Sequence, residues 1–214
     1  MSAAETFQPL AGLPGVNAAF VPRLAGVDVS TDRTTALERL APVHAEYLRG
    51  RGFDAAHLAT AEQVHGDVVA VAADASLHGG ADALVTGVRG LGLGIYVADC
   101  AAVYLADRKG RAIGLVHSGR AGTGKNIVGR AIALLGAEFG VAADDLVVEI
   151  SPCIRPPLYE TDFAAEIAAQ ARAAGVTDVR DRAICTGQNI DRYYSYRVER
   201  GQTGRMLAVL ALHS

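Results

Sequence analysis

Two histidines and one cysteine are the residues of this chain best suited to chemistry. His65 follows Gln-Val, Cys100 follows Ala-Asp, and His117 precedes Ser-Gly. Imidazole nitrogen and thiolate sulfur are ligands that zinc prefers, and three protein ligands leave a fourth position for water or substrate. No local pattern such as CxxC or HExxH joins these residues, so the fold must bring them together.

The elements that would position these ligands are short apolar runs in the middle of the chain. Gly and Asp separate the runs, which predicts buried strands at 67–71, 83–86, 95–97, 103–105 and 113–116. Cys100 comes after one run and His117 directly follows another. Both project from the same end of a sheet only if neighbouring strands deliver them there.

Helical periodicity and further apolar runs predict the remaining elements. A helix over 35–49 places Leu37, Leu40, Val43, Tyr47 and Leu48 on one face, and Thr35 with Glu38 has the spacing of a capping box. Helices are also predicted near 127–139 and over 164–174, the latter ended by Gly175. Strands are predicted at 146–150 and 206–212, the second in a central position. No linker divides the chain, so we expect one α/β (α+β) domain over 1–214.

Composition excludes several classes of protein. Of 214 residues, 50% are hydrophobic and 20% are charged, and the net charge of -3 gives no basic field for nucleic acid. Three cysteines do not suggest a secreted disulfide framework. The first residues lack the pattern of a signal peptide, and no apolar run is long enough to span a bilayer. We therefore expect a reduced, cytoplasmic protein without nucleic-acid or membrane partners.

A glycine-rich segment over 119–126, GRAGTGKN, differs from a P-loop at one position, because Asn126 stands where a Ser or Thr would bind magnesium. A P-loop also leaves His117 unexplained. A glycine-rich turn that enters a helix can still bind an anion through its backbone N–H groups, helped here by Arg120 and Lys125. The alternative is a flexible turn with solvated charges.

Each candidate residue has an ordinary structural explanation beside the functional one. Taken alone, His65 fits a loop histidine with satisfied hydrogen bonds, and Cys100 fits a small buried hydrophobe. Asp99 suits a general acid/base or a group that supports a metal site, and equally a cap or an ion-pair member. Arg197, in Tyr-Ser-Tyr-Arg, suits phosphate or carboxylate recognition, although the aromatic residues there also suit a core.

Six short motifs occur in a fixed order: QVHG at 63–66, ADALVT at 81–86, ADC at 98–100, GLVHSG at 114–119, SPCIRPPLYE at 151–160, and SYR with TGRM near the end. Together they resemble the bacterial polyphenol-oxidase or laccase-domain family, understood as zinc-dependent purine nucleoside phosphorylases. The resemblance covers nearly the whole chain. It implies that His65, Cys100 and His117 are the three metal ligands.

The chain departs from the family around these ligands. The family's HAGWRG segment is HSGRAG here, with Arg120 at the Trp position and Ala121 at the Arg position. The ligands are kept while the surrounding pocket is altered. The resulting candidates are Asp99 and Arg23 for catalysis, and Gln63, Arg120, Lys125 and Arg197 for substrate binding.

The resemblance implies a layered α-β-β-α fold and phosphorolysis of adenosine, inosine or methylthioadenosine, with some adenosine deamination. The partners would then be a purine nucleoside and phosphate, with zinc as the cofactor. Three alternatives stay open: a metal-free cysteine hydrolase using Cys100 and His117, a copper-dependent polyphenol oxidase, and a non-catalytic module that binds zinc or a nucleotide. Copper suits the chain less well, because multicopper chemistry needs more histidines than one compact cluster supplies.

Overall fold

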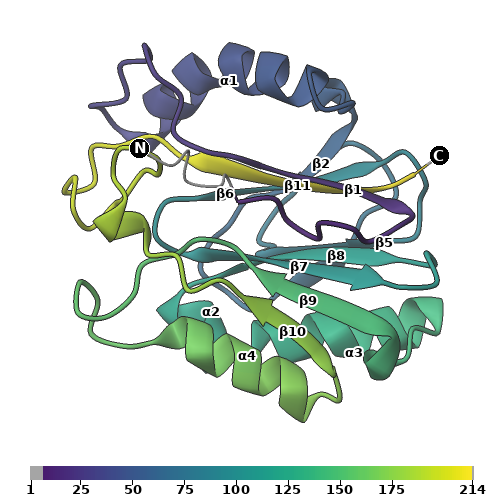
Figure 1. Ribbon diagram of the computed structural model, residues 1–214. Coiled ribbons are helices and arrows are strands. Elements are labelled where there is room, and N and C mark those ends of the chain that lie inside the picture. Colours follow the sequence, from purple (N-terminus) through teal and green to yellow (C-terminus); the bar gives the residue numbers. More distant parts are fainter. Residues whose placement is uncertain (1–6, 214) are drawn as a thin grey trace.

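The computed structural model describes residues 7–213, which form two β-sheets packed face to face between layers of helix (Figure 1). The first sheet has the strand order β1 (Val16–Val21), β11 (Met206–Leu212), β6 (Gly92–Val97), β2 (Leu58–Ala61) and β4 (Leu77–His78). Helix α1 (Arg33–Arg49) lies over its outer face. The predicted central position of β11 is confirmed, because β1 and β6 flank it.

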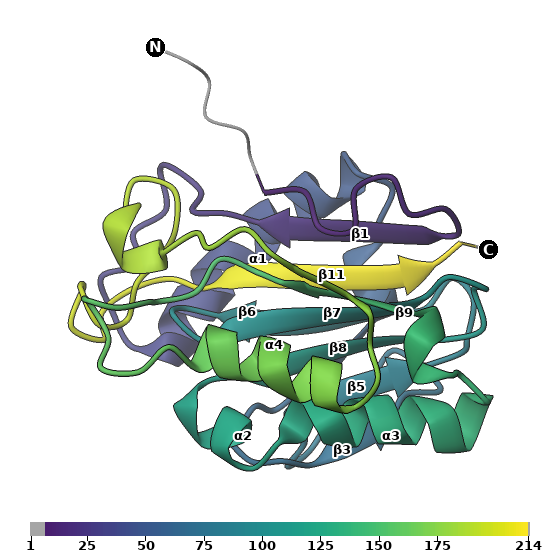
Figure 2. The same ribbon diagram turned by 60° about the horizontal axis from the view of Figure 1, so that its bottom comes forward.

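The second sheet carries the other helices on its outer face (Figure 2). Its strand order is β10 (Asp178–Asp181), β9 (Leu146–Ile150), β7 (Ala101–Asp107), β8 (Ile113–Ser118), β5 (Ala83–Thr86) and β3 (Val69–Val71). The helices are α2 (Arg120–Gly124), α3 (Ile127–Phe139) and α4 (Phe163–Ala173). Three short 3-10 helices complete the described elements: η1 (Ala55–His57), η2 (Ala143–Asp145) and η3 (Thr186–Gln188). The layered α-β-β-α arrangement expected from the sequence is confirmed.

Strands β7 and β11 are apolar on both faces because both faces of each sheet are covered. Every residue of β7 is buried. Tyr104 and its alternate neighbours pack in the core between the sheets, whereas Val103 and Leu105 pack against the helices of the second sheet. Strand β11 divides its residues in the same way between the central core and α1. This double burial explains the uninterrupted apolar runs of the sequence.

The element boundaries differ from the sequence predictions in informative ways. Helix α1 begins at Arg33, and Asp32 is its N-cap, accepting hydrogen bonds from the backbone N–H of Thr34 and Thr35. The predicted capping box of Thr35 and Glu38 is therefore wrong. Strands β1, β2, β4 and β10 were not predicted; β4 has two residues, and β10 is a sheet-edge strand with three charged residues out of four. Such edge strands lack the apolar run that marks a buried one.

The pairing of β7 with β8 settles how two of the candidate ligands meet. These strands are antiparallel, with Ala102 opposite His117 and Ala101 opposite Ser118. Cys100 directly precedes β7, so it lies beside the end of β8. The β6–β7 turn that carries Cys100 is at the left of Figure 1.

Among the described residues, no helix combines the length and the apolar character needed to cross a membrane.

Candidate metal centre and its cavity

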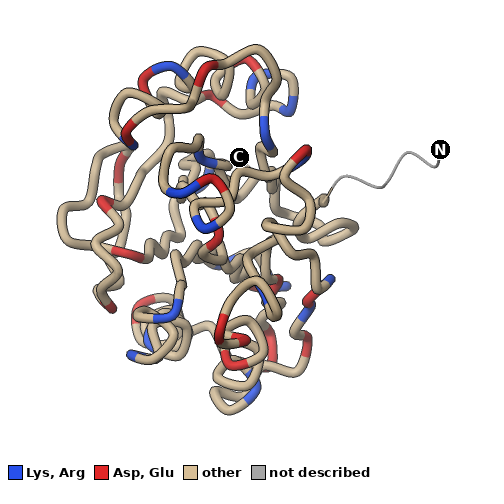
Figure 3. The backbone as a smooth tube through the Cα atoms, turned by 90° about the vertical axis from the view of Figure 1, so that its left-hand side faces the viewer, with Lys and Arg blue, Asp and Glu red and all other residues tan. Residues whose placement is uncertain are grey.

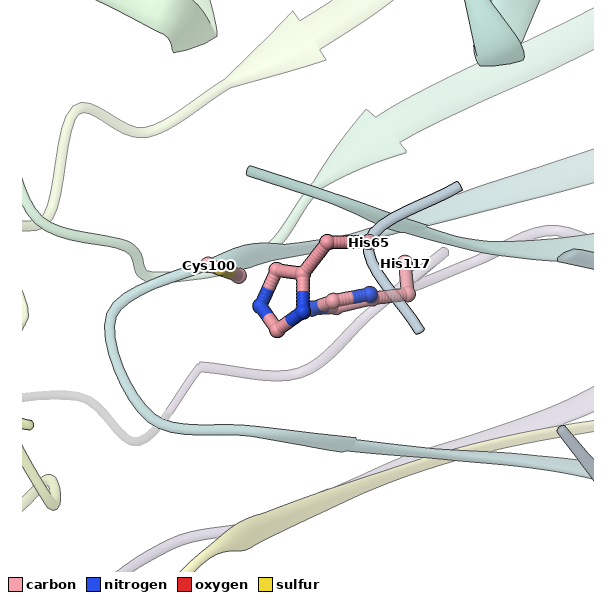
Figure 4. Close-up of side chains that lie close together, drawn as sticks. All are labelled: His65, Cys100 and His117. Atoms are coloured by element: carbon pink, nitrogen blue, oxygen red, sulfur yellow. The ribbon is translucent and has the colours of Figure 1, made fainter. Parts of the chain in front are cut away.

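The structure brings His65, Cys100 and His117 together (Figure 4). One ligand atom from each residue lies within 4.8 Å of the other two. The two imidazole rings meet edge to face, with centroids 4.9 Å apart. His117 is buried, Cys100 is half-buried and His65 is exposed, so the cluster opens to solvent on one side. Two imidazoles and one thiol at this spacing can bind a single metal ion.

A buried carboxylate orients one of these imidazoles. Asp82, directly before β5, accepts a hydrogen bond from Nδ1 of His117 at 2.8 Å. Because Nδ1 then carries the proton, Nε2 of His117 is left to bind a metal. A carboxylate behind a ligating histidine is the usual support for metal sites of this kind.

The same carboxylate shapes the loop that carries His65. Asp82 accepts hydrogen bonds from the backbone N–H of Val64, His65 and Gly66, at 3.1, 2.9 and 2.6 Å. His65 has φ of 60°, in the left-handed region that costs most residues about 1–3 kcal/mol. The hydrogen bonds to Asp82 hold the loop in this conformation and so direct His65 toward the other two ligands.

Gln63 fastens the other end of this loop to the first sheet. Its side-chain amide donates to the carbonyl of Tyr96 at 2.6 Å and accepts from the Tyr96 N–H at 2.9 Å. Gln63 also has a left-handed backbone, with φ of 65°. Both polar groups of its side chain are thereby engaged by the backbone of β6. The side chain proposed from sequence for substrate binding thus positions the loop, although it also lines the cavity.

The electrostatics of the cluster favour a thiolate. Burial alone would raise the pKa of the Cys100 thiol, but the rings of His117 and His65 outweigh it and lower that pKa to about 6. For His117, burial acts to lower the pKa, while Asp82 and Cys100 raise it to about 9. A thiol poised to lose its proton next to imidazoles is the form in which cysteine binds a metal.

Asp99, directly before Cys100, holds the segment that includes Arg197. Its carboxylate accepts hydrogen bonds from the hydroxyls of Thr186 and Ser195, at 2.7 and 3.1 Å, and from the backbone N–H of Arg197 at 2.7 Å. Asp99 is 7% exposed and has φ of 85°. Three hydrogen bonds to a buried carboxylate suit a residue that positions the β6–β7 turn better than one that exchanges a proton with substrate.

The ligand cluster opens into a cavity of about 570 Å³. This volume is within the range of small-molecule sites. Seven of the residues singled out in the sequence line it: Gln63, His65, Asp99, Cys100, His117, Arg120 and Arg197. The other lining residues had no role predicted for them individually, although Ala98, Ile154, Tyr159 and Tyr196 lie in the ordered motifs; they are Arg33, Tyr96, Ala98, Ile154, Tyr159, Phe163, Tyr196 and Arg205. Arg205 lies within the TGRM motif, whereas Arg33, at the start of a surface helix, gave no signal.

Two predicted residues lie outside this cavity lining. Arg23 forms an ion pair with Glu199 at 2.7 Å, and its guanidinium lies 4.4 Å from the ring centroid of Tyr194. Glu199 also accepts from the backbone N–H of Ser195, so Arg23 braces the segment next to Arg197. Lys125 is exposed and lies 3.5 Å from the carbonyl of His65. Neither side chain is placed to touch a molecule in the cavity.

The glycine-rich segment does not form a phosphate-cradling loop that runs into a long helix. It forms the five-residue α2, and Asn126 then takes a left-handed conformation and caps α3. The segment instead has a packing role. A Cβ atom at Gly119 would collide with Sγ of Cys100, so the chain needs glycine where it passes the thiol.

The fold and site together define an α-β-β-α sandwich with a His–Cys–His cluster that could hold a metal ion, at a cavity that four arginines help to line. The family model described as "Multi-copper polyphenol oxidoreductase laccase" matches residues 23–172 and 159–213. The chain belongs to this family.

Curated relatives agree on a second description. "Purine nucleoside phosphorylase ORF3" of Streptomyces griseus is 33% identical over 189 residues, which is 74% of this chain and 75% of the relative. "Purine nucleoside phosphorylase" of Deinococcus radiodurans is 31% identical over 227 residues, or 91% of this chain and 88% of the relative. These names support an enzyme.

The solved structure of YlmD from Geobacillus stearothermophilus has the same fold. It matches with a TM-score of 0.82 and 25% identity, and the match covers 94% of this chain and 93% of that chain. The crystal structure of Bacillus licheniformis YfiH also gives a TM-score of 0.82, at 20% identity.

The role of Asp82 predicts the behaviour of Asp82→Asn. The amide keeps the size of the side chain but loses the charge that fixes His117, so we expect the dissociation constant of the bound metal to rise by about 10–100-fold. Competition with a chelator measures it. Asp67→Asn, the same change in the loop next to His65, should leave metal affinity as it is. An unaltered affinity in Asp82→Asn would contradict the assigned role.

The contact at Gly119 generates a second prediction. Gly119→Ala places a methyl group against Sγ of Cys100, and we expect the purified protein to lose most of its metal. Gly124→Ala is the matched control, because a Cβ there meets nothing within 4 Å. Elemental analysis of both variants gives the comparison. Full metal content in Gly119→Ala would show that the thiol is not fixed at this position.

Proposed function

We propose that this protein is a zinc-dependent purine nucleoside phosphorylase that cleaves adenosine, inosine or methylthioadenosine with phosphate. The observation that carries the proposal is the opening of the His65–Cys100–His117 cluster into an arginine-lined cavity. The names of the curated relatives support the same activity.

The donor set fits zinc. A thiol with a pKa of about 6 and an imidazole whose Nδ1 is held by Asp82 supply a thiolate sulfur and a directed nitrogen, and the exposed His65 supplies another nitrogen. Three protein donors are the number found at catalytic zinc sites. Zinc bound there would supply a Lewis acid with an open coordination position.

The cavity residues suit the reaction itself. Cleavage of an N-glycosidic bond builds positive charge on the sugar, and phosphate both stabilises that charge and attacks the anomeric carbon. Arginine side chains hold phosphate in place through paired N–H donors. Tyr159, Phe163 and Tyr196 line the same cavity and offer aromatic faces for the purine base. The products are the free base and the 1-phosphate of the sugar, which is ribose 1-phosphate for adenosine and inosine and methylthioribose 1-phosphate for methylthioadenosine.

The predicted site residues divide into two groups under this proposal. Arg120 and Arg197 lie in the cavity, where they would contact substrate. Gln63, Asp99 and Arg23 act through the segments they hold, namely the loop of His65 and the segment that includes Arg197. Lys125 would add positive charge near the His65 loop without touching the substrate.

A nucleoside panel tests the proposed reaction. We expect cleavage of adenosine, inosine or methylthioadenosine to require phosphate and to release the corresponding sugar 1-phosphate, with about one zinc per chain by elemental analysis. Cys100→Ala should lose both the zinc and the activity. Conversion of adenosine to inosine in the same samples measures deamination. Free ribose released at the same rate without phosphate would contradict the proposed phosphorylase activity. Copper in place of zinc would contradict the proposed cofactor.

One observation favours a second candidate, a cysteine hydrolase. The acidic thiol of Cys100 next to His117 is also the arrangement of a cysteine nucleophile and its base. The two functions differ in whether the thiolate is already occupied by metal.

Alkylation separates them. In the metal-loaded protein we expect Cys100 to react slowly with iodoacetamide. After chelation it should react quickly, with a rate that rises as the pH passes about 6, because a lowered pKa populates the thiolate above that pH. Cys153, whose thiol pKa is raised to about 12 by burial, is the internal control and should stay unreacted. Fast alkylation before chelation, with activity that resists chelators, would establish the hydrolase.

A further inference from the structure

The arginines of the cavity differ in how their charge is balanced. Arg197 forms an ion pair with Glu160 at 2.7 Å. Among the described residues, Arg33, Arg120 and Arg205 have no carboxylate within ion-pair distance. Figure 3 views the side of the molecule that carries the β6–β7 turn, where Lys and Arg segments lie near the centre beside acidic ones. Uncompensated cations that line a cavity favour an anionic ligand.

Arg205 is the most constrained of the three. It is half-buried directly before β11, and its Nη1 donates to the carbonyls of Thr203 and Gly204, at 2.9 Å each. These two bonds fix the direction of the guanidinium and leave its other N–H groups for a ligand. Burial lowers the pKa of Arg205 and the charge of Arg33 lowers it further, and together they outweigh the opposing effect of Tyr196, Cys100 and Asp99. The positive charges of Arg33 and Arg205 therefore lie near each other, where burial partly excludes solvent from Arg205.

Arg33 approaches from a different element. It is the first residue of α1, and its side chain makes one hydrogen bond among the described residues, to the carbonyl of Glu62 at 3.4 Å. The rest of the guanidinium is free to bind. Arg33 is exposed and lines the same cavity as Arg205, so the two guanidinium groups can approach one ligand from two elements, α1 and the start of β11.

The glycine-rich turn offers the cavity less side-chain charge than the sequence indicated. The backbone N–H groups of Thr123, Lys125 and Asn126 donate to carbonyls within the turn, which leaves only those at the start of α2 for an anion. Lys125 lies outside the cavity lining, and Arg120 is the single charged side chain that the turn offers to it. Arg33 and Arg205 bring two guanidinium groups to the same cavity, neither of them in an ion pair among the described residues.

We propose that Arg33 and Arg205 form the phosphate subsite of this cavity. Two guanidinium forks from separate elements match a phosphoryl dianion in charge and in hydrogen-bond geometry. Its role as the cosubstrate site rests on the proposed phosphorylase function. The anion would relieve the repulsion between the two arginines, which a neutral ligand cannot do.

Titration with inorganic phosphate tests the subsite without turnover. Calorimetry on the metal-loaded protein should show a dissociation constant at least about tenfold higher for Arg33→Gln than for the parent, as expected for loss of one charge-assisted hydrogen bond. Arg39→Gln is the matched control: it removes the same charge from the same helix, from a residue paired with Asp28. Equal phosphate affinity in the Arg33 and Arg39 variants would overturn the proposal.

Further variants guard against folding defects and against the alternative site. Arg205→Lys keeps the charge but loses the fork, and it too should bind phosphate more weakly than the parent while keeping its metal content. A larger loss of phosphate affinity in Arg120→Gln than in Arg33→Gln would locate the anion at the glycine-rich turn instead. AMP is titrated in parallel. If Arg33→Gln lowers the affinity for AMP alone and leaves the affinity for inorganic phosphate unchanged, the two arginines bind the phosphate of a nucleotide and the proposal fails.

Kinetics then distinguish failure of the subsite from failure of the proposed function. If the protein is a phosphorylase, Arg33→Gln should raise the KM for phosphate and leave the KM for the nucleoside nearly unchanged. Active phosphorolysis with an unaltered KM for phosphate overturns the subsite alone. Weakened phosphate binding in a protein that cleaves no nucleoside supports the subsite as an anion site and overturns the phosphorylase.

Discussion

The four hydrogen bonds accepted by Asp82 are the interaction on which the functional site depends. One buried carboxylate joins the start of β5, the loop of His65 and the ring of His117. Those hydrogen bonds lower the pKa of Asp82 despite its burial, so it is a carboxylate at neutral pH. The same group thus fixes backbone conformation, imidazole orientation and local charge. Without Asp82, no hydrogen bond would hold the left-handed backbone of His65 that directs its side chain toward the other ligands.

A second buried carboxylate, Asp99, positions another part of the site. Asp99 connects the β6–β7 turn to the segment before β11, through Ser195 and the backbone of Arg197. Arg23 and Glu199 brace that segment from behind. Asp82 therefore positions His65 and His117, whereas Asp99 positions the turn of Cys100 together with the segment of Arg197.

The sequence predicts the buried parts of the fold and the ligands, but not the supports. Apolar runs locate β5, β7 and β8 because those strands are covered on both sides. The ordered motifs, rather than residue type alone, select His65 and Cys100 among the six histidines and three cysteines of the chain. The ADALVT motif contains Asp82 but does not predict its role, because the four groups that donate to it come from two distant segments. Arg33 was missed for the same reason: a surface arginine becomes a cavity residue only through tertiary packing.

The apolar character of β7 on both faces has a consequence for folding specificity. A strand with one polar face resists a one-residue slip, because the slip would bury polar groups and expose apolar ones. β7 lacks that safeguard, since every one of its residues is buried. Slipped alignments would instead misplace the turn at Asp99 and the end of β8 at His117, and leave buried carboxylates without donors. The polar groups of the functional site therefore also favour the native strand register over registers shifted by one residue.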